Sequence, residues 1–173
     1  LHGSNVISEI KLPDDLWSIK ADRGQIEQVI ANLTINSKQA MPGGGVLHIE
    51  ARNQPISSYP VDSDPESDTV VISIRDEGIG IPSKIIESIF DPYFTTKDHG
   101  HGLGLAIVHS IIAQHSGNIR ADSVTGEGAT FTITLPAASQ SETKEIPESD
   151  RADDETDAKS KLHILIMDDE EMV

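Results

Sequence analysis

The sequence contains no cysteine, which excludes disulfides, cysteine-based metal sites and a thiol nucleophile. It also lacks an apolar run close to the ~20 residues that a membrane-spanning helix needs, and its N-terminus carries no targeting pattern. We therefore expect a soluble fragment that makes no membrane contact. Its 173 residues, 36% of them hydrophobic, suit one ordinary domain with some surplus chain rather than two complete domains. Residues 1–4 are interpreted as a cloning scar and carry no weight in the fold prediction.

Basic residues are few: 13 Lys and Arg stand against 29 Asp and Glu, for a net charge of −16. This balance argues against nucleic-acid binding, because contacts to phosphates need clustered Lys and Arg. The acidic excess is uneven along the chain. Residues 53–68, 137–161 and 168–171 carry a net charge of −4 each, so the rest of the chain carries only −4. The predicted core is therefore only mildly acidic.

The C-terminal part of the chain divides into two segments. Residues 137–161 contain no aromatic side chain and one large aliphatic one, Ile146, so they cannot bury enough surface to offset the entropy of ordering. We expect an acidic, flexible linker there, after one folded domain over residues 5–136. The apolar run of residues 162–167 has the length of a buried strand and leads directly into an acidic cluster. Residues 162–173 are interpreted as the truncated start of a second domain.

Hydrophobic periodicity predicts two main helices within the folded domain. A capping-box pattern at Asp22 and Gln25 opens an amphipathic helix that runs to about Met41. A second, largely buried helix is predicted over residues 103–115, with Gly117 as its C-terminal cap.

Alternating and β-branched segments predict the strands, and a short third helix is expected over residues 83–89. The predicted strands are residues 46–52 and 69–75, followed by a hairpin of residues 119–124 and 129–135. Residues 6–12 and 17–20 are expected to add one or two further strands. Together these elements predict an α+β fold, a two-layer sandwich with helices on one face of a mixed, largely antiparallel sheet.

The first candidate binding motif is Asp76-Glu77-Gly78-Ile79-Gly80-Ile81-Pro82, which directly follows a predicted strand. Its glycines allow the backbone to approach a ligand closely. A buried carboxylate at the strand end would select adenine, because adenine presents an amine where guanine presents an oxygen. A strand-ending turn capped by Asp76 is the alternative. A dinucleotide-binding fingerprint does not fit, because no third glycine follows at the required spacing and Pro82 interrupts.

The second candidate is a pair of asparagines, Asn32 and Asn36, which share one face of the first predicted helix, with Lys38 close by. Amide oxygens are hard ligands suited to Mg²⁺, which completes its octahedron with phosphate oxygens and water. A solvent-exposed face, or bonding of the amides to neighbouring backbone, is the alternative.

The third candidate is a glycine-rich segment that runs into the second predicted helix, with glycines at Gly100, Gly102 and Gly104. Backbone amides at a helix start bind phosphate well. Thr95, Thr96 and Lys97 lie just upstream, where two hydroxyls and an ammonium can reach the same phosphates. A flexible loop before a buried helix is the alternative.

Four histidines lie in or near the same region, at positions 99, 101, 109 and 115. They are not expected to converge on a metal ion. His109 and His115 are instead expected to pack against helices or lie on the surface.

Five motifs follow one another in the chain. They are Asn32-x-x-x-Asn36, Asp76-x-Gly78-x-Gly80, Phe90-Asp91-Pro92-Tyr93-Phe94-Thr95-Thr96-Lys97, Gly100-x-Gly102-Leu103-Gly104-Leu105 and Gly126-x-Gly128-x-Thr130-Phe131. In this order they resemble the N, G1, F, G2 and G3 boxes of sensor histidine kinases, over about residues 17–136. Residues 36–45 look closest to the nitrogen-regulatory and hybrid-kinase branch. Ser37 departs from the family pattern, which usually has Ala there.

The resemblance implies the Bergerat ATP-binding fold, shared with gyrase and heat-shock chaperone ATPases, with ATP and Mg²⁺ as ligands. It implies that Asp76 binds adenine, that Asn36 holds Mg²⁺, and that residues of about 91–102 form a mobile lid over the phosphates. Asn32, Asn36 and Lys97 are the expected catalytic residues. The other expected nucleotide contacts are Lys38, Gly78, Gly80, Ile81, Phe94, Thr95, Thr96, Gly100, Gly102, Leu103, Gly104, Leu105 and Thr130.

The activity implied by the resemblance is transfer of the ATP γ-phosphoryl group to a histidine on a dimerisation domain missing from this fragment, which alone should not autophosphorylate. In hydrolytic relatives a water-activating Glu stands four residues before the metal-binding Asn, where this sequence has Asn32. An amide cannot act as a general base, and a neutral histidine nitrogen that attacks phosphorus needs none. A gyrase-type ATP hydrolase and a non-catalytic nucleotide-binding regulatory module are the alternatives.

The C-terminal residues 162–173 resemble the first strand and acidic pocket of a response-regulator receiver domain, in which Asp168 and Asp169 would form an incomplete Mg²⁺ site. A solvated strand end is the alternative. The parent would then be a hybrid sensor kinase. Its expected partners are the histidine-bearing dimerisation domain and a receiver domain or response regulator. A cytoplasmic location is expected for the fragment, whether its parent is free or anchored in a membrane.

Overall fold

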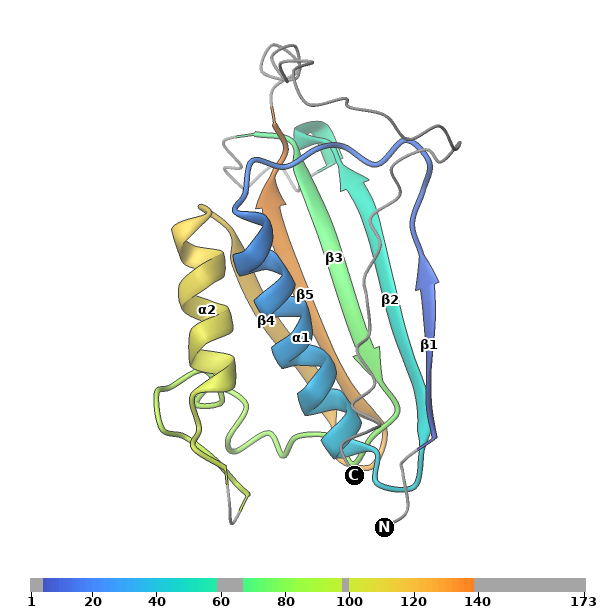
Figure 1. Cartoon of the computed structure of the whole chain (residues 1–173), viewed down its shortest axis with the longest axis vertical. Helices are drawn as coiled ribbons and strands as arrows, with labels where there is room; N and C mark the ends of the chain where they lie inside the picture. Colours follow the sequence, from blue (N-terminus) through green and yellow to red (C-terminus); the bar gives the residue numbers. More distant parts are fainter. Residues whose placement is uncertain (1–4, 59–66, 98–99, 139–173) are drawn as a thin grey trace, which may run out of the picture. The chain divides into compact units, whose positions relative to one another are not determined.

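A five-stranded mixed sheet forms the frame of the computed structural model, which describes residues 5–58, 67–97 and 100–138. The strands stand in the order β1-β2-β3-β5-β4 (Figure 1). Their bounds are Val6–Lys11 for β1, Gly45–Gln54 for β2, Thr69–Asp76 for β3, Asn118–Val124 for β4 and Gly128–Pro136 for β5. Only β1 and β2 pair in parallel, and the other neighbours are antiparallel. The predicted mixed, largely antiparallel sheet is therefore confirmed.

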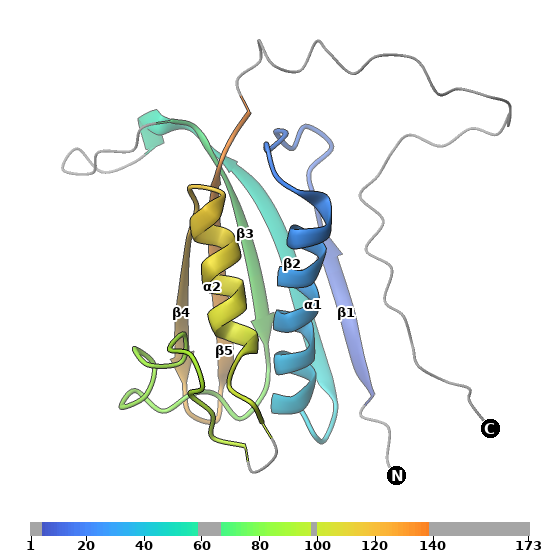
Figure 2. The same ribbon diagram turned by 60° about the vertical axis from the view of Figure 1, so that its left-hand side comes forward.

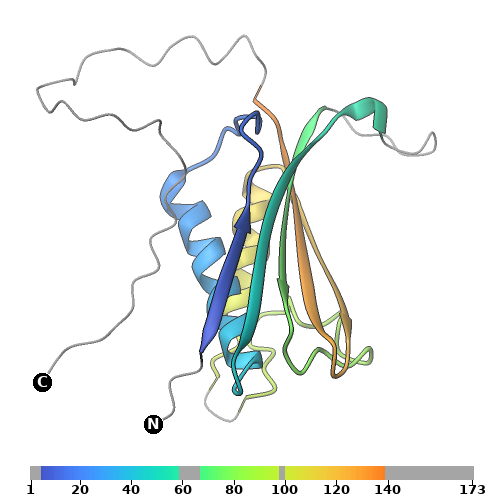
Figure 3. The same ribbon diagram turned by 90° about the vertical axis from the view of Figure 1, so that its right-hand side faces the viewer.

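Two helices, α1 (Arg23–Ala40) and α2 (Gly104–Gln114), cover one face of this sheet (Figure 3). Helix α1 connects β1 to β2 and so supplies the crossover that parallel neighbours require. Figures 1 and 2 show that the helices run in opposite directions. The end of α1, the start of α2, the end of β3 and the turn between β4 and β5 consequently lie at the same end of the domain.

The core lies between the helices and the sheet, as the alternation of apolar and polar residues along the strands predicts. Antiparallel pairing places the alternate apolar residues of β2, β3 and β5 on one face. Leu33 of α1, Ile74 of β3 and Val108 of α2 are fully buried, each 0% exposed. Both helices therefore pack against the middle of the sheet and bury the core of the α+β sandwich.

The N-terminus of α1 is capped as predicted, but only half of the capping box forms. The Asp22 side chain accepts a hydrogen bond from the Gln25 backbone N–H at 2.8 Å. The Asp22 backbone N–H donates to His115 Nε2 at 3.0 Å instead of to Gln25. Gln25 Oε1 is buried with no hydrogen-bond partner among the described residues. His115, at the end of α2, thus ties the two helices together, which is the packing position, one of the two that the sequence left open.

The predicted short helix is wrong, and only one of the two possible N-terminal strands forms. Residues 83–90 form successive turns rather than a helix, with the Ile85 N–H bonded to the Pro82 carbonyl and the Ser88 N–H to that of Ile85. A segment this short gains too few hydrogen bonds to offset the cost of helix nucleation. Residues 17–20 do not form a strand, because only Ile19 pairs, in one isolated bridge to Ala137.

The ends of two other elements differ from the prediction. Helix α2 ends with Ser116 at φ 54°, so the left-handed residue is Ser116 and not the expected Gly117. The Gly117 N–H closes the helix by donating to the Ile112 carbonyl at 2.9 Å. The folded domain also extends two residues past the predicted linker boundary, since Ala137 and Ala138 bond to the carbonyls of Asp68 and Ser18. The rest of the predicted linker and residues 162–173 lie outside the described residues.

Replacement of Leu33 by Ala tests the core directly. Leu33 is fully buried, so Leu33→Ala should lower the free energy of unfolding by about 2–5 kcal/mol, measured by urea denaturation. Ile35 lies on the same helix but is 53% exposed, so Ile35→Ala should change it by no more than about 0.5 kcal/mol. Equal losses in the two variants would contradict this packing of α1.

Candidate functional site

The carboxylate of Asp76, at the end of β3, is the centre of the candidate site. It is 2% exposed and accepts three hydrogen bonds within the domain. Oδ1 accepts from the backbone N–H groups of Gly78 at 2.9 Å and of Ala129 at 3.2 Å. Oδ2 accepts from the hydroxyl of Ser37 on α1 at 3.2 Å. Donors from the following loop, from β5 and from α1 therefore fix one buried carboxylate.

The loop after Asp76 is held against the end of α1. The Ile79 N–H donates to the Ala40 carbonyl at 3.0 Å. A Cβ atom added at Gly78 would lie 2.7 Å from that same carbonyl oxygen. The glycine is thus needed because backbone packs directly on backbone here.

The same loop is also bound to the turn between β4 and β5. The Gly126 N–H donates to the Ile79 carbonyl at 2.8 Å, and the Ile81 N–H donates to Ser123 Oγ at 2.7 Å. Gly80 has φ +70° and lies so close to β4 that an added Cβ would stand 2.2 Å from the Val124 carbonyl oxygen. The backbone N–H of Ile81, an expected nucleotide contact, is therefore used inside the protein.

Asn32 and Asn36 of α1 face the start of α2. A Cβ added at Gly104, the first residue of α2, would lie 3.8 Å from Asn36 Nδ2 and 3.9 Å from Asn32 Oδ1. Asn32 Nδ2 is buried and has no hydrogen-bond partner among the described residues. The two amides and the N-terminal end of a helix dipole thus border the same space.

Lys97 reaches the same region from the segment before α2. Its ammonium donates to Asn36 Oδ1 at 3.2 Å and to Gln39 Oε1, so it spans from this segment to α1. Burial lowers the pKa of Lys97, because desolvation disfavours the charged amine. The hydrogen bond from Lys97 shows that Asn36 Oδ1 already accepts from a cationic group.

The segment expected to form the lid begins and ends at one backbone contact. The Tyr93 N–H donates to the Gly102 carbonyl at 2.9 Å, which closes the base of the segment. Thr95 Oγ1 accepts from the Lys97 N–H at 3.1 Å inside it. Phe94 is half-buried, whereas Thr95 and Thr96 are exposed.

Four other residues were expected to contact the nucleotide, and they lie on α1, around the start of α2 and on β5. Lys38 is exposed in the last turn of α1, and Leu103 and Leu105 flank the first residue of α2. Thr130 is not brought to the site. It pairs with Arg75 in the antiparallel ladder, so both side chains point to the face of the sheet opposite the helices. Ala129, one residue earlier, carries the backbone N–H that reaches Asp76.

Three contributions escaped the sequence-based prediction. Gln39 accepts from Lys97, Ala129 donates to Asp76, and Ser37 donates to Asp76. The only available signal was the position of Ser37 directly after Asn36, where the family usually has Ala. The other two depend on pairings between distant segments.

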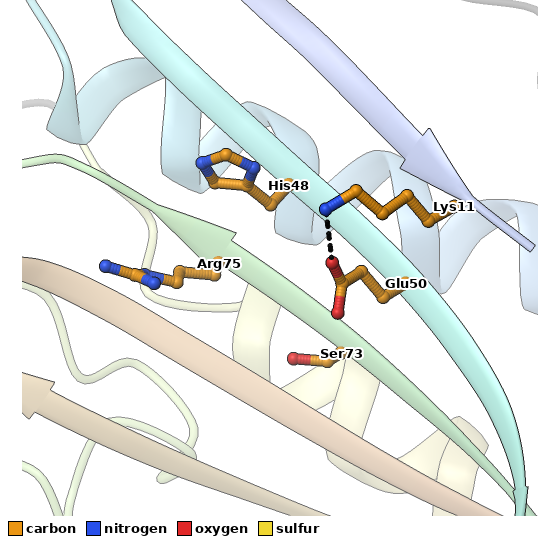
Figure 4. Close-up of a pocket in the computed structure, with 5 residues that line it drawn as sticks. All are labelled: Lys11, His48, Glu50, Ser73 and Arg75. Atoms are coloured by element: carbon orange, nitrogen blue, oxygen red, sulfur yellow. Dashed lines mark hydrogen bonds and ion pairs between the residues drawn. The ribbon is translucent and has the colours of Figure 1, made fainter.

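A depression of about 220 Å³ lies on the face of the sheet opposite the helices. Figure 4 shows the side chains that line it, Lys11, His48, Glu50, Ser73 and Arg75. The Lys11 ammonium and the Glu50 carboxylate form an ion pair across it at 3.1 Å. The polar groups of this depression partly neutralise one another, and none of the expected site residues lines it.

The described part of the chain has neither a cluster of metal-ligating side chains nor a membrane-spanning helix. No group of three or more His, Asp or Glu side chains there is arranged to hold a metal ion. His109 instead packs against Phe90, with ring centroids 5.8 Å apart. Neither helix is long and apolar enough to cross a membrane.

The fold and this constellation define an ATP-binding domain of the Bergerat type. The model of the histidine kinase-, DNA gyrase B- and HSP90-like ATPase family matches residues 21–139, so the chain belongs to this family. The catalytic domain of the histidine kinase ThkA superposes with a TM-score of 0.61 at 30% identity, covering 77% of this chain and 80% of that one. Full-length ShkA in complex with AMPPNP gives a TM-score of 0.62 at 26% identity, over 77% of this chain and 26% of that one.

Curated relatives carry the names of sensor kinases. Sensor kinase CckA of Brucella abortus is 39% identical over 190 residues, which cover 100% of this chain and 19% of the relative. Sensor histidine kinase ZraS of Salmonella typhimurium is 42% identical over 123 residues, or 71% of this chain and 24% of the relative. The chain thus spans a quarter or less of the length of these two proteins.

The residues present fit ATP and Mg²⁺. Asp76 Oδ2 has a single protein donor, and the buried Asn32 amide lacks a partner among the described residues, so polar groups remain for a ligand. Asn36 Oδ1 is a hard oxygen that already accepts from the Lys97 ammonium, which suits a divalent cation. The start of α2 suits phosphate oxygens.

Gly80→Ala tests the loop that carries the site. We expect a loss of about 3 kcal/mol or more in the free energy of unfolding, because the new methyl group meets the Val124 carbonyl and φ is positive. Gly126→Ala is the matched control, since Gly126 has φ +88° but nothing within 4 Å of an added Cβ. It should cost only about 1 kcal/mol by thermal denaturation. A Gly80 variant as stable as the Gly126 variant would contradict the close approach of the loop to β4.

Proposed function

We propose that this domain binds Mg-ATP and transfers the γ-phosphoryl group to a histidine on a separate dimerisation domain, as the catalytic part of a sensor histidine kinase. The observation that carries the proposal is the convergence at one end of the fold of a buried carboxylate, two asparagine amides, an ammonium and the start of a helix. Each matches one part of the ligand: the amine of adenine, the metal ion or the phosphates. The names of the relatives support the same activity.

Each residue has a distinct part in this proposal. Asp76 accepts a hydrogen bond from the exocyclic amine of adenine and leaves guanine unpaired. Asn36 ligates Mg²⁺, which supplies neutralisation of the phosphate charge. Lys97 and the first N–H groups of α2 contact phosphate oxygens. Catalysis then depends on positioning and charge, because Asn32 cannot take a proton from water. This favours transfer to a histidine nitrogen over hydrolysis.

The nucleotide site is tested by calorimetric titration with a non-hydrolysable ATP analogue and the matching GTP analogue. We expect micromolar-range, adenine-selective binding, or roughly −7 to −8 kcal/mol. Asp76→Asn should weaken binding of the ATP analogue by at least about 100-fold, since an amide offers a donor where the base needs a charged acceptor. Asp122→Asn, on the exposed side of β4, is the matched control and should bind normally. Folded protein that binds neither nucleotide would refute the site.

Phosphoryl transfer is tested by joining this chain to a histidine-bearing dimerisation domain and supplying labelled ATP with Mg²⁺. Acid-labile, base-stable label on the histidine is expected, and Asn36→Ala should slow its appearance by about 100-fold or more. Asn118→Ala, an exposed Asn on β4, should label at the normal rate. Normal ATP binding without labelling would point to a regulatory module, and steady phosphate release by the domain alone to a hydrolase.

We further propose that the parent is a hybrid kinase of the nitrogen-regulatory-like branch. Residues 162–173 would begin its receiver domain, with Asp168 and Asp169 in an incomplete Mg²⁺ site, after an acidic linker. Support comes from the sequence pattern and from the match to the sensor kinase of Brucella abortus, which extends over the whole chain. The partners are then the dimerisation domain and a receiver domain or response regulator. A cytoplasmic location follows from the dependence of the proposed reaction on ATP.

A further inference from the structure

Ser37 is a buried hydroxyl inside α1 that the proposed reaction does not use. It is 1% exposed, and a buried hydroxyl costs free energy unless it is hydrogen-bonded. Its Oγ atom donates to Asp76 Oδ2 at 3.2 Å. The partner is therefore the same carboxylate that the proposed function assigns to adenine.

The hydrogen bonds to Asp76 leave little of the carboxylate free. An ionised carboxylate has about four lone-pair positions. The N–H groups of Gly78 and Ala129 use two of them on Oδ1, and the Ser37 hydroxyl uses one on Oδ2. One position remains, and it lies on Oδ2, beside the hydroxyl of Ser37.

Ser37 also changes what this corner of the site offers to a ligand. The single hydroxyl hydrogen is committed to Asp76, so the lone pairs of Ser37 Oγ act only as acceptors. Asp76 Oδ2 and Ser37 Oγ, 3.2 Å apart, form a pair of neighbouring acceptors. An exocyclic amine carries two N–H donors, whereas a carbonyl oxygen has none. The pair therefore suits an amino group and repels an oxygen.

We propose that Ser37 is a specificity-determining residue of the nucleotide site: it holds Asp76 Oδ2 in place and adds a second acceptor for the amino group of adenine. The inference rests on the proposed function, because it assumes that Asp76 faces the base. It deepens that function by assigning discrimination between 6-amino and 6-oxo purines to two residues rather than one. The side chain touches no phosphate in this scheme, so its effect should be confined to the base.

The test compares three nucleotides that differ at one ring position: ATP has an amino group, inosine triphosphate an oxygen and purine riboside triphosphate only hydrogen. Their dissociation constants are measured calorimetrically for the whole chain. Ser37→Ala should weaken ATP binding about three- to tenfold and leave purine riboside triphosphate within about twofold. Because it also removes an acceptor that repels the oxygen of inosine triphosphate, the ATP preference over inosine triphosphate should fall by at least the same factor. Ser110→Ala, an exposed serine of α2, is the control and should change none of the three.

A purely structural role for Ser37 predicts a different pattern. If the hydroxyl only stabilised α1, Ser37→Ala would weaken all three nucleotides equally, and this result would overturn the inference. Ser37→Cys keeps the side-chain shape, with a slightly larger atom and a weaker donor, so it should give an intermediate preference. Should the Ala variant fail to fold, the Cys variant decides, and an unchanged preference in it overturns the inference.

The two proposals fail in different ways. If the wild-type chain binds no ATP, the proposed function and this inference both fall. If ATP binds and Asp76→Asn abolishes binding, but the base preference of Ser37→Ala is that of the wild type, only the role of Ser37 is wrong.

Discussion

The need to satisfy one buried carboxylate organises the functional end of this domain. Asp76 is withdrawn from water at the end of β3, and burying an ionised group is costly unless several donors face it. Those donors come from α1, from the loop after β3 and from the start of β5. Each of the three parts must be in place before the carboxylate is stable. The geometry of the site is therefore coupled to the packing of both layers.

The glycines of the loop make this arrangement possible. Backbone at Gly78 rests on the last turn of α1, and backbone at Gly80 rests on β4, at distances that no side chain would permit. At the opposite end of the domain, the two helices are joined by His115, which accepts a hydrogen bond from the backbone N–H of Asp22, the N-cap residue of α1. This hydrogen bond links α1 and α2 at the end away from the site. Asn36 and Gly104 lie next to each other at the functional end.

The two sides of the proposed site differ in character. The adenine side is buried and preformed, with its hydrogen bonds already made to Asp76. The phosphate side is held by one lysine that spans from the segment before α2 to Asn36 and Gln39. Asn36 Oδ1, the oxygen that would hold a metal ion in the proposed function, accepts from the Lys97 ammonium in the structure. In the proposed function, the Asp76 side therefore recognises the base and the Lys97 side contacts the phosphates.

The sequence by itself determined the elements that depend on local pattern: the helix capped by Asp22, the hairpin, the alternation of β2, the fold class and the order of the five boxes. It failed where the outcome depends on segments far apart in the chain. The parallel pairing of β1, the outward direction of Thr130 and the bridge from Lys97 to α1 all follow from strand register and helix packing. The role of Ser37 belongs to the same class, because a serine inside a helix gains its meaning only from the carboxylate placed against it by β3. Periodicity specifies which face of an element is buried, whereas tertiary structure alone decides what lies across from it.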